Sequence, residues 1–285
     1  MICTEFYDGQ GLGNQLWLYV VSRVKSLDLG VQHGVVHPER FKGMHFMNLD
    51  FGAQVYGGES PEGGPPKSLP VGITNYYREP IVRHPITKQD ISGLDPDFMK
   101  IVDHTKIDGN FQSPSFIDHR KAQIGDWLMP ISRYRKSEVN PLECVINFRG
   151  GEYRHMTDVF LPSSYWKHAR ELMLRTEPRM TFKVVTDDPK LARRFFPKRE
   201  ISNQDMSNDY ADVLYAQYLI LSNSSFGWFP AWLNVNSRLT IAPKYWWGFN
   251  RNQYWSTSKI ETYEFAYLDL DSNLIGDRHL MKEQE

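Results

Sequence analysis

The residues best suited to chemistry lie in the stretch 144–153, which reads Cys-Val-Ile-Asn-Phe-Arg-Gly-Gly-Glu-Tyr. A buried strand is predicted to end at Phe148, so Arg149 follows it directly, with two glycines behind. Ligands of open α/β sheets bind at the carboxyl ends of the strands. A planar guanidinium suits a phosphate, and glycines let an anion come close to the main chain. The stretch indicates an anion site, although an arginine that only pairs with a surface acid would read the same way.

Two more predicted strand ends carry polar side chains. Asp187 and Asp188 follow a strand at 181–186, and a strand at 220–223 ends in Ser222-Asn-Ser-Ser225, just before a helix. Serine hydroxyls and the free N–H groups at a helix start bind phosphate, and a carboxylate can accept hydrogen bonds from a guanine edge. With Arg149 these residues indicate a nucleotide site. Taken singly, each is equally typical of turns and helix caps.

A glycine-rich turn follows the first predicted strand. Residues 8–14 read Asp-Gly-Gln-Gly-Leu-Gly-Asn, between a strand at 2–7 and a helix at 15–29, an arrangement that can hold phosphate. The dinucleotide fingerprint places its third glycine where Asn14 stands, and no acid ends an obvious second strand, so NAD is not expected. The Asn14 amide either caps the helix or touches a ligand, and its spacing favours the cap.

The elements that must position these residues alternate in the second half of the chain. Strands are predicted at 143–148, 181–186, 220–223 and 239–242, and helices at 163–174, 189–196, 209–218 and 226–235. Such alternation predicts an α/β fold with a mostly parallel sheet, helices on both faces, and the strand ends at one edge.

The first half of the chain is less regular. Its predicted elements are a surface loop at 57–66, a helix at 86–104 interrupted at Gly93 and Pro96, a strand at 105–111, and a helix from 112–115 to about 130. The basic segment 133–141 marks the predicted boundary between a domain at 1–139 and a second at 140–285. The C-terminal tail could pack back on the first domain.

The composition is that of an ordinary globular protein. The 285 residues are 41% hydrophobic and 24% charged, enough for two medium domains. The net charge of −1 gives no global attraction for nucleic acid or an anionic membrane, so phosphate binding must be local. Two cysteines, Cys3 and Cys144, make no disulfide framework and fit a reducing compartment. No apolar run nears the roughly 20 residues of a membrane span, and no signal peptide is visible. A chain that starts at Met1 is expected in the cytoplasm, or peripheral to membrane-linked glycan assembly.

Several different motifs follow one another along the chain. They are Gly11-Leu-Gly-Asn-Gln-Leu16, Asp108-Gly-Asn-Phe-Gln-Ser113, Asn147-Phe-Arg-Gly-Gly-Glu-Tyr153, Val185-Thr-Asp-Asp188, Ser222-Asn-Ser-Ser-Phe-Gly-Trp-Phe-Pro-Ala-Trp-Leu-Asn234 and Ile241-Ala-Pro-Lys-Tyr-Trp-Trp247. In order and spacing, over about residues 2 to 250, this set resembles the α-1,2-fucosyltransferases. The α-1,6- and protein O-fucosyltransferases share the arginine motif more distantly.

The resemblance implies a GT-B-type fold, two Rossmann-like domains facing a cleft that holds GDP-fucose. It also implies an inverting transfer to a hydroxyl of an oligosaccharide acceptor, expected to be α-1,2 to galactose, with no metal and no cofactor beyond the donor substrate. The sequence has no His/Asp/Glu cluster at metal-ligand spacing, which agrees.

The resemblance also implies roles for single residues. Arg149 would neutralise the β-phosphate, Asn14 would reach donor and acceptor, and one of Asp187 and Asp188 would read guanine. The donor would further be held by Gly11, Gly13, Asn147, Ser224, Ser225 and Phe226. Glu152 is a candidate general base by position, as are Asp158 and Asp8.

Three positions depart from the family pattern His-x-Arg-Arg-Gly-Asp-Tyr. Asn147 replaces the His that contacts the donor, Gly150 replaces the second Arg, and Glu152 replaces Asp. These changes keep two alternatives open: a transferase of another GDP-sugar, or a non-catalytic protein of the same fold that binds a glycan or a nucleotide.

Overall fold

The computed structural model describes residues 1–58, 60, 65–83, 90–92, 95–202, 204–253 and 260–276. The chain forms two compact units, Met1–Met129 with Ser256–Ile260, and Pro130–Trp255 with Glu261–Glu285. The division lies between Met129 and Pro130, earlier than the predicted boundary after residue 139, so the basic segment 133–141 belongs to the second unit. That the C-terminal tail packs back on the first domain stays a prediction, because residues 277–285 lie outside the described residues.

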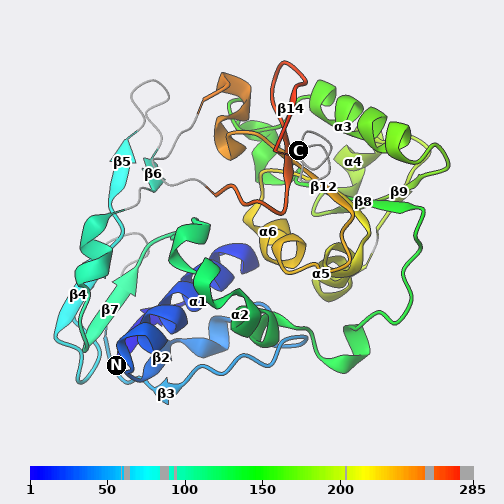
Figure 1. The fold of residues 1–285 in the computed structure, drawn as a ribbon. Coiled ribbons are helices and arrows are strands. Elements are labelled where there is room, and N and C mark those ends of the chain that lie inside the picture. Colours follow the sequence, from blue (N-terminus) through cyan, green and yellow to red (C-terminus); the bar gives the residue numbers. More distant parts are fainter. Residues whose placement is uncertain are drawn as a thin grey trace, which may run out of the picture. The chain divides into compact units, whose positions relative to one another are not determined.

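The first unit is built on a parallel sheet with the strand order β3-β2-β1-β7-β4 (Figure 1). In that order the strands are Ala53–Gln54, His33–Val36, Ile2–Glu5, Thr105–Asp108 and Asn75–Arg78. A separate antiparallel pair joins β5 (Ile81–Arg83) to β6 (Asp90–Ser92), and the α-helices are α1 (Leu12–Leu29) and α2 (Lys121–Leu128).

Helix α1 packs its apolar side chains into the core of this unit. Leu16 and Val20 are fully buried, as the helical spacing predicts, whereas Leu27 is 42% exposed instead of lying on the buried face. Arg23 is accommodated by stacking 4.1 Å from the Trp127 ring. The helix ends at Gly30, whose φ of +66° is the left-handed conformation that glycine adopts most easily.

The predicted helix at 86–104 is wrong where the structure describes it. That region contains strand β6 and a short 3₁₀ helix at Pro96–Lys100, which Asp95 caps by accepting a hydrogen bond from the Asp97 N–H. Proline is well suited to a first helical position, whereas in a helix interior it removes a backbone hydrogen bond. The helix predicted from 112–115 to 130 is also shorter, because 3₁₀ turns at Pro114–Phe116 and Asp118–Arg120 precede α2.

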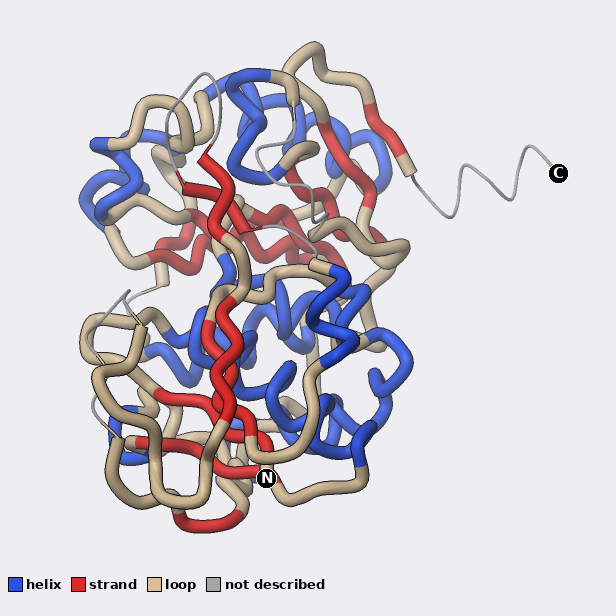
Figure 2. Tube along the Cα trace, turned by 90° about the vertical axis from the view of Figure 1, so that its left-hand side faces the viewer, coloured by secondary structure: helices blue, strands red, loops and turns tan. Residues whose placement is uncertain are grey.

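The second unit is built on a larger sheet with the order β10-β9-β8-β11-β12-β13-β14. Figure 2 shows the strands of both units in red and their helices in blue. In that order the strands are Glu200–Ile201, Thr181–Thr186, Glu143–Phe148, Tyr218–Leu221, Leu239–Pro243, Ala266–Leu268 and Leu274–Ile275. All neighbours pair in parallel except β13 and β14. The helices are α3 (Ser163–Thr176), α4 (Pro189–Phe195), α5 (Met206–Tyr215) and α6 (Ser225–Trp232).

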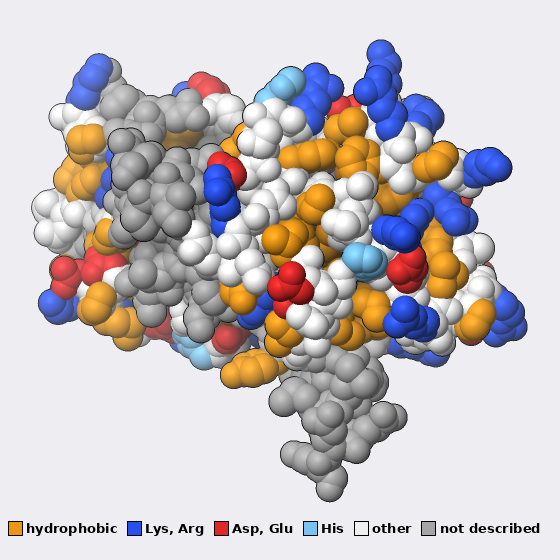
Figure 3. Space-filling view, turned by 90° about the horizontal axis from the view of Figure 1, so that it is seen from above, with side chains coloured by type: hydrophobic (Ala, Val, Ile, Leu, Met, Phe, Trp, Pro, Cys, Tyr) orange, Lys and Arg blue, Asp and Glu red, His pale blue; other side chains and the backbone are white. Residues whose placement is uncertain are grey.

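Aromatic packing fixes α3 and α4 on one face of this sheet. Trp166 of α3 lies 5.3 Å from the Phe148 ring of β8 and 5.6 Å from Phe196, which follows α4. All three aromatic residues belong to one buried core. On the outer surface, lysine and arginine side chains gather at the right of Figure 3. Both units are therefore α/β with mostly parallel sheets, which confirms the predicted class. In the part of the chain that the structure describes, no helix is both long and apolar enough to cross a bilayer.

Candidate functional site

Three parallel strands bring the predicted site residues of the second unit to one edge. Strand β8 lies between β9 and β11, with Phe148 opposite Thr186 and Asn147 opposite Leu221. The three strands therefore end level with one another, and the segments that start at Arg149, Asp187 and Ser222 leave the same edge of the sheet. The predicted convergence of these strand ends is confirmed.

The Arg149 guanidinium is held in place from several sides. Its Nη1 lies 2.5 Å from Asp187 Oδ2, and its Nη2 donates to Glu152 Oε1 at 2.9 Å. Its Cζ lies 5.3 Å from the Tyr153 ring. The side chain is 31% exposed, and its buried Nε has no hydrogen-bond partner among the described residues. Arginine has five N–H donors, so a fixed, half-exposed donor group remains at the strand end.

The two glycines after Arg149 fit closely against the neighbouring acids. The Gly150 N–H donates to Asp187 Oδ1 at 2.9 Å. A Cβ at residue 150 would lie 2.7 Å from the Asp188 Cβ, and a Cβ at residue 151 would lie 2.3 Å from Asp187 Oδ2. Gly151 also has a φ of +21°. The turn therefore has no room for the second arginine of the family pattern.

Replacing Gly151 by alanine is expected to destabilise this turn. The new Cβ would displace the Asp187 carboxylate from Arg149, so we expect a loss of about 1–3 kcal/mol in the free energy of unfolding. Urea unfolding of the full chain measures it. Gly11→Ala is the matched control, because a Cβ there would meet nothing within 4 Å, and a cost below about 1 kcal/mol is expected because alanine is a poorer N-cap than glycine. Equal effects of the two substitutions would contradict the prediction.

The structure gives Asp187 and Asp188 different surroundings. Asp187 faces Arg149, whereas Asp188 caps helix α4 by accepting from the Leu191 N–H at 3.0 Å. The second oxygen of Asp188 lies 3.1 Å from Arg154. Three acids thus surround two arginines at this edge. An anion bound here must depend on directed N–H donors, since the local charge is not positive.

The turn before α6 is fixed by its neighbours. Ser224 caps the helix, with its Oγ 3.4 Å from the Phe226 N–H, and Ser225 is the first helical residue. Asn223 donates to the Val159 carbonyl at 2.8 Å and accepts from the Trp247 indole N–H at 3.0 Å. Trp247 belongs to the motif at 241–247, but the sequence did not predict that its indole would hold this turn in place. Because α6 points its first N–H groups toward this edge, it offers further donors.

Asn147, predicted to touch the donor, lies inside the second unit. It is 5% exposed, and its Oδ1 accepts from the Ser222 hydroxyl at 3.0 Å. A Cβ on Gly227 would lie only 2.7 Å from that same oxygen. The Asn147 side chain therefore ties β8 to β11 and to helix α6.

The first unit places Asn14 differently from the favoured interpretation. Helix α1 begins at Leu12 with Gly11 as its N-cap residue, so the interpretation of Asn14 as the cap is wrong. Asn14 lies in the first helical turn after the buried Gly13, and its Oδ1 accepts from the Gln112 amide at 3.1 Å. This contact could not be predicted from the sequence, because the two residues are 98 positions apart.

A buried carboxylate holds the turn that carries Gln112. Glu79 Oε2 accepts from the N–H groups of Asn110 and Phe111 at 2.8 and 2.7 Å, while its Oε1 is buried without a partner among the described residues. Burial raises the pKa of Glu79 to about 7 despite these hydrogen bonds. The folded protein therefore binds this proton more tightly than the unfolded chain does.

The raised pKa of Glu79 predicts a pH-dependent stability. The protonated Glu79 side chain favours the folded state. This contribution to the free energy of unfolding is fully present below the pKa of about 4.3 that Glu has in the unfolded chain, and it is lost as the pH rises through the folded-state pKa of about 7. From about pH 5 to about pH 8, wild type should therefore lose up to about 3 kcal/mol relative to Glu79→Gln. Urea unfolding of both proteins at several pH values measures the difference. Stabilities that change in parallel across this range would refute the assignment.

The candidate bases all have cationic neighbours. Glu152 is 70% exposed beside Arg149, Asp158 lies 2.7 Å from Arg251, and Asp8, 84% exposed, lies 3.4 Å from Arg40. Within the described ranges, no group of three His, Cys, Asp or Glu residues is arranged to hold a metal ion.

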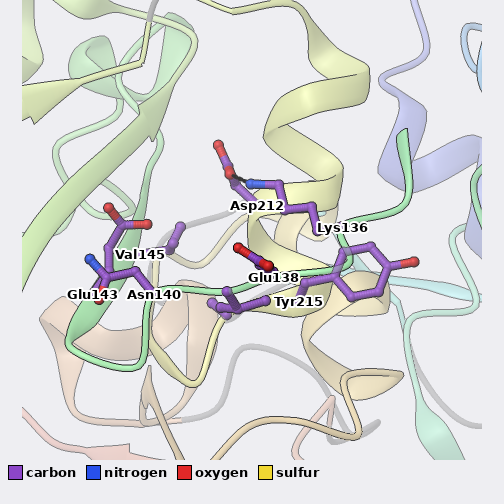
Figure 4. A pocket seen from close by; sticks show the side chains of 9 residues that line it. Lys136, Glu138, Asn140, Glu143, Val145, Asp212 and Tyr215 are labelled. Carbon is purple, nitrogen blue, oxygen red and sulfur yellow. Dashed lines mark hydrogen bonds and ion pairs between the residues drawn. The ribbon is translucent and has the colours of Figure 1, made fainter. Parts of the chain in front are cut away.

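A pocket lies at the opposite end of strand β8 (Figure 4). Glu143 and Val145, from the first half of that strand, line it, and Lys136 reaches across it to the buried Asp212. Asp212 also lies 2.9 Å from Lys183. Arg149 follows the other end of β8, so this pocket is not part of the predicted site.

No protein-family model matches the chain, and no curated protein matches it significantly.

Proposed function

We propose that the protein is an inverting, metal-independent glycosyltransferase that moves fucose from GDP-fucose to a hydroxyl of an acceptor glycan, with the galactose 2-hydroxyl as the favoured acceptor. Its two α/β units would then be the two halves of a GT-B-type enzyme. The observation that carries the proposal is the position of Arg149, whose ordered guanidinium stands at the carboxyl edge of a parallel sheet, one strand away from the serine turn that begins α6.

The chemistry of the transfer asks for such donors. When the bond between the anomeric carbon and the diphosphate breaks, negative charge develops on the departing GDP. Fixed N–H donors stabilise that charge because they need no reorganisation during the reaction. Arg149 would supply a permanent cation, and the start of α6 would supply backbone N–H groups and the positive end of its dipole.

The acids around Arg149 would then orient it. Asp187 and Glu152 each use one of its terminal nitrogens, which leaves N–H groups for a phosphate oxygen. Asp188 would hold Arg154 and helix α4 in place, so Asp187 is the better candidate for a carboxylate that senses the nucleotide. Asn14, set by Gln112, would act from the first unit on the donor and the acceptor.

A second candidate is a transferase that uses another GDP-sugar. The buried Asn147 favours it, because this side chain is engaged with Ser222 where the family's histidine contacts the donor. A non-catalytic protein that binds a glycan or nucleotide is the third possibility, and the low net charge around Arg149 is compatible with it.

A donor panel separates these candidates. The full chain is incubated with GDP-fucose, GDP-mannose or a UDP-sugar and a galactose-terminated oligosaccharide, and the released nucleotide and the glycan product are both measured. Transfer from GDP-fucose alone is expected. Turnover of another GDP-sugar without GDP-fucose would establish the second candidate, and no turnover together with nucleotide binding would establish the third.

A further inference from the structure

A surface of unpaired cations covers helix α4 and the segment that follows it. Residues 189–200 read Pro-Lys-Leu-Ala-Arg-Arg-Phe-Phe-Pro-Lys-Arg-Glu, with five cations and one acid. The five side chains are all exposed, and no ion pair with an acid engages any of them in the described part of the chain. With Arg170 of α3, they form what we call the basic surface: Arg170, Lys190, Arg193, Arg194, Lys198 and Arg199.

The fold itself turns these cations outward. Ala192 and Phe196 are buried against the sheet. Lys190, Arg193 and Arg194 are spaced three and four residues apart, so they share one face of the helix, directed away from that core. Their exposure is therefore a fixed property of the packed helix.

Arg170 adds a cation that no ion pair engages among the described residues. Its Cζ lies 5.7 Å from the Phe196 ring, and its buried Nε has no hydrogen-bond partner among the residues that the structure describes. Burial, and next the positive charge of Arg199, lower the pKa of Arg170, and Glu171 offsets this only in part. The positive charges of Arg170 and Arg199 therefore repel each other, and a bound anion would reduce this repulsion.

The charge is local to this part of the chain. Between residues 163 and 200, ten Lys and Arg accompany five Asp and Glu, although the whole chain has a net charge of −1. Such an uneven distribution orients a protein toward an anionic surface even when its total charge is near zero.

We propose that the basic surface binds the anionic headgroups of a lipid bilayer, which attract clustered Lys and Arg side chains. A single-stranded nucleic acid fits less well, because it requires exposed aromatic side chains on which bases can stack. Phe195 and Phe196, the aromatic residues of this segment, pack into the core instead. The proposal does not depend on the transferase activity.

Vesicle sedimentation tests the proposal with the full chain. We expect retention on vesicles that contain about a third phosphatidylglycerol, none on pure phosphatidylcholine, and release when salt rises from about 0.1 M to about 0.5 M. Lys190→Gln with Arg193→Gln should weaken the partition coefficient about 30-fold. Lys42→Gln with Arg133→Gln, which removes the same two charges from exposed positions elsewhere, should leave it nearly unchanged.

Far-UV circular dichroism of both variants confirms that they are folded, and Lys198→Gln with Arg199→Gln provides a second test pair on the same surface. Equal binding to neutral vesicles would overturn the proposal, as would equal losses in the test and control variants. Binding of a labelled single-stranded oligonucleotide without any binding of vesicles would assign the surface to nucleic acid and overturn it too.

Discussion

Replacing Arg149 by alanine is expected to lower the rate of glycosyl transfer by about 10²- to 10³-fold, the usual effect of removing one fixed donor from a developing negative charge. The loss should appear mainly in kcat, because the charge on the diphosphate is greatest in the transition state. Arg149→Lys should recover only part of the rate. A lysine keeps the charge but cannot contact Asp187, Glu152 and a phosphate with one planar group.

Arg154→Ala is the matched control for this substitution. Arg154 is an arginine of the same turn, but it is 52% exposed and pairs with Asp188 instead of standing at the strand end. We expect a change of less than about tenfold, since a screened surface pair contributes little. Steady-state kinetics with the donor that proves active measures both variants. Full activity of Arg149→Ala, or equal losses in the two variants, would contradict the assigned role.

Replacing Lys106 by methionine is expected to cost about 3–5 kcal/mol of stability, because it leaves a buried carboxylate without its partner. The Lys106 side chain is 1% exposed, and its Nζ lies 2.6 Å from Oε2 of Glu5, which is 5% exposed. Lys106 also donates to the hydroxyls of Ser60 and Tyr7. Urea unfolding of the full chain at neutral pH measures the loss.

A second substitution separates the lost pair from lost packing. Lys106→Met combined with Glu5→Met removes both charges, and most of the stability should return. Lys100→Met is the control for an exposed pair: Lys100 lies 2.5 Å from Asp97 and is 75% exposed, so the expected cost is below about 1 kcal/mol. If the double variant were as unstable as Lys106→Met alone, the buried charge on Glu5 would not be the cause.

The sequence predicted the second unit better than the first. Strands β8 and β9 begin and end where the apolar runs predict, because both are buried in the middle of the sheet. In the first unit, β2 and β4 were missed. The first reads His-Gly-Val-Val, and the second, Asn-Tyr-Tyr-Arg, is only partly buried, so neither has the apolar pattern of a central strand.

The candidate site was predictable as a place but not as a set of contacts. Parallel topology alone brings Arg149, Asp187 and Ser222 to one edge. The pairing of Arg149 with Asp187 depends on the backbone of the Gly150–Gly151 turn, which no pattern of residue types encodes. The chain's low net charge likewise concealed the basic surface, because acids elsewhere cancel it.

The interior position of Asn147 was also hidden from the sequence. A polar residue near a strand end is as compatible with a ligand contact as with a buried hydrogen bond. The structure shows the buried hydrogen bond. Gly227 lets helix α6 approach the Asn147 amide, and the Ser222 hydroxyl donates a hydrogen bond to the amide oxygen of Asn147.

Calorimetric titration of the full chain with GDP most directly tests the central claim that the Arg149 edge holds a nucleoside diphosphate. Wild type is expected to bind GDP, Arg149→Ala to bind it at least about tenfold more weakly, and Arg154→Ala to bind it nearly as wild type does. Absence of GDP binding by the wild-type protein, or equal affinity in Arg149→Ala, would contradict the claim.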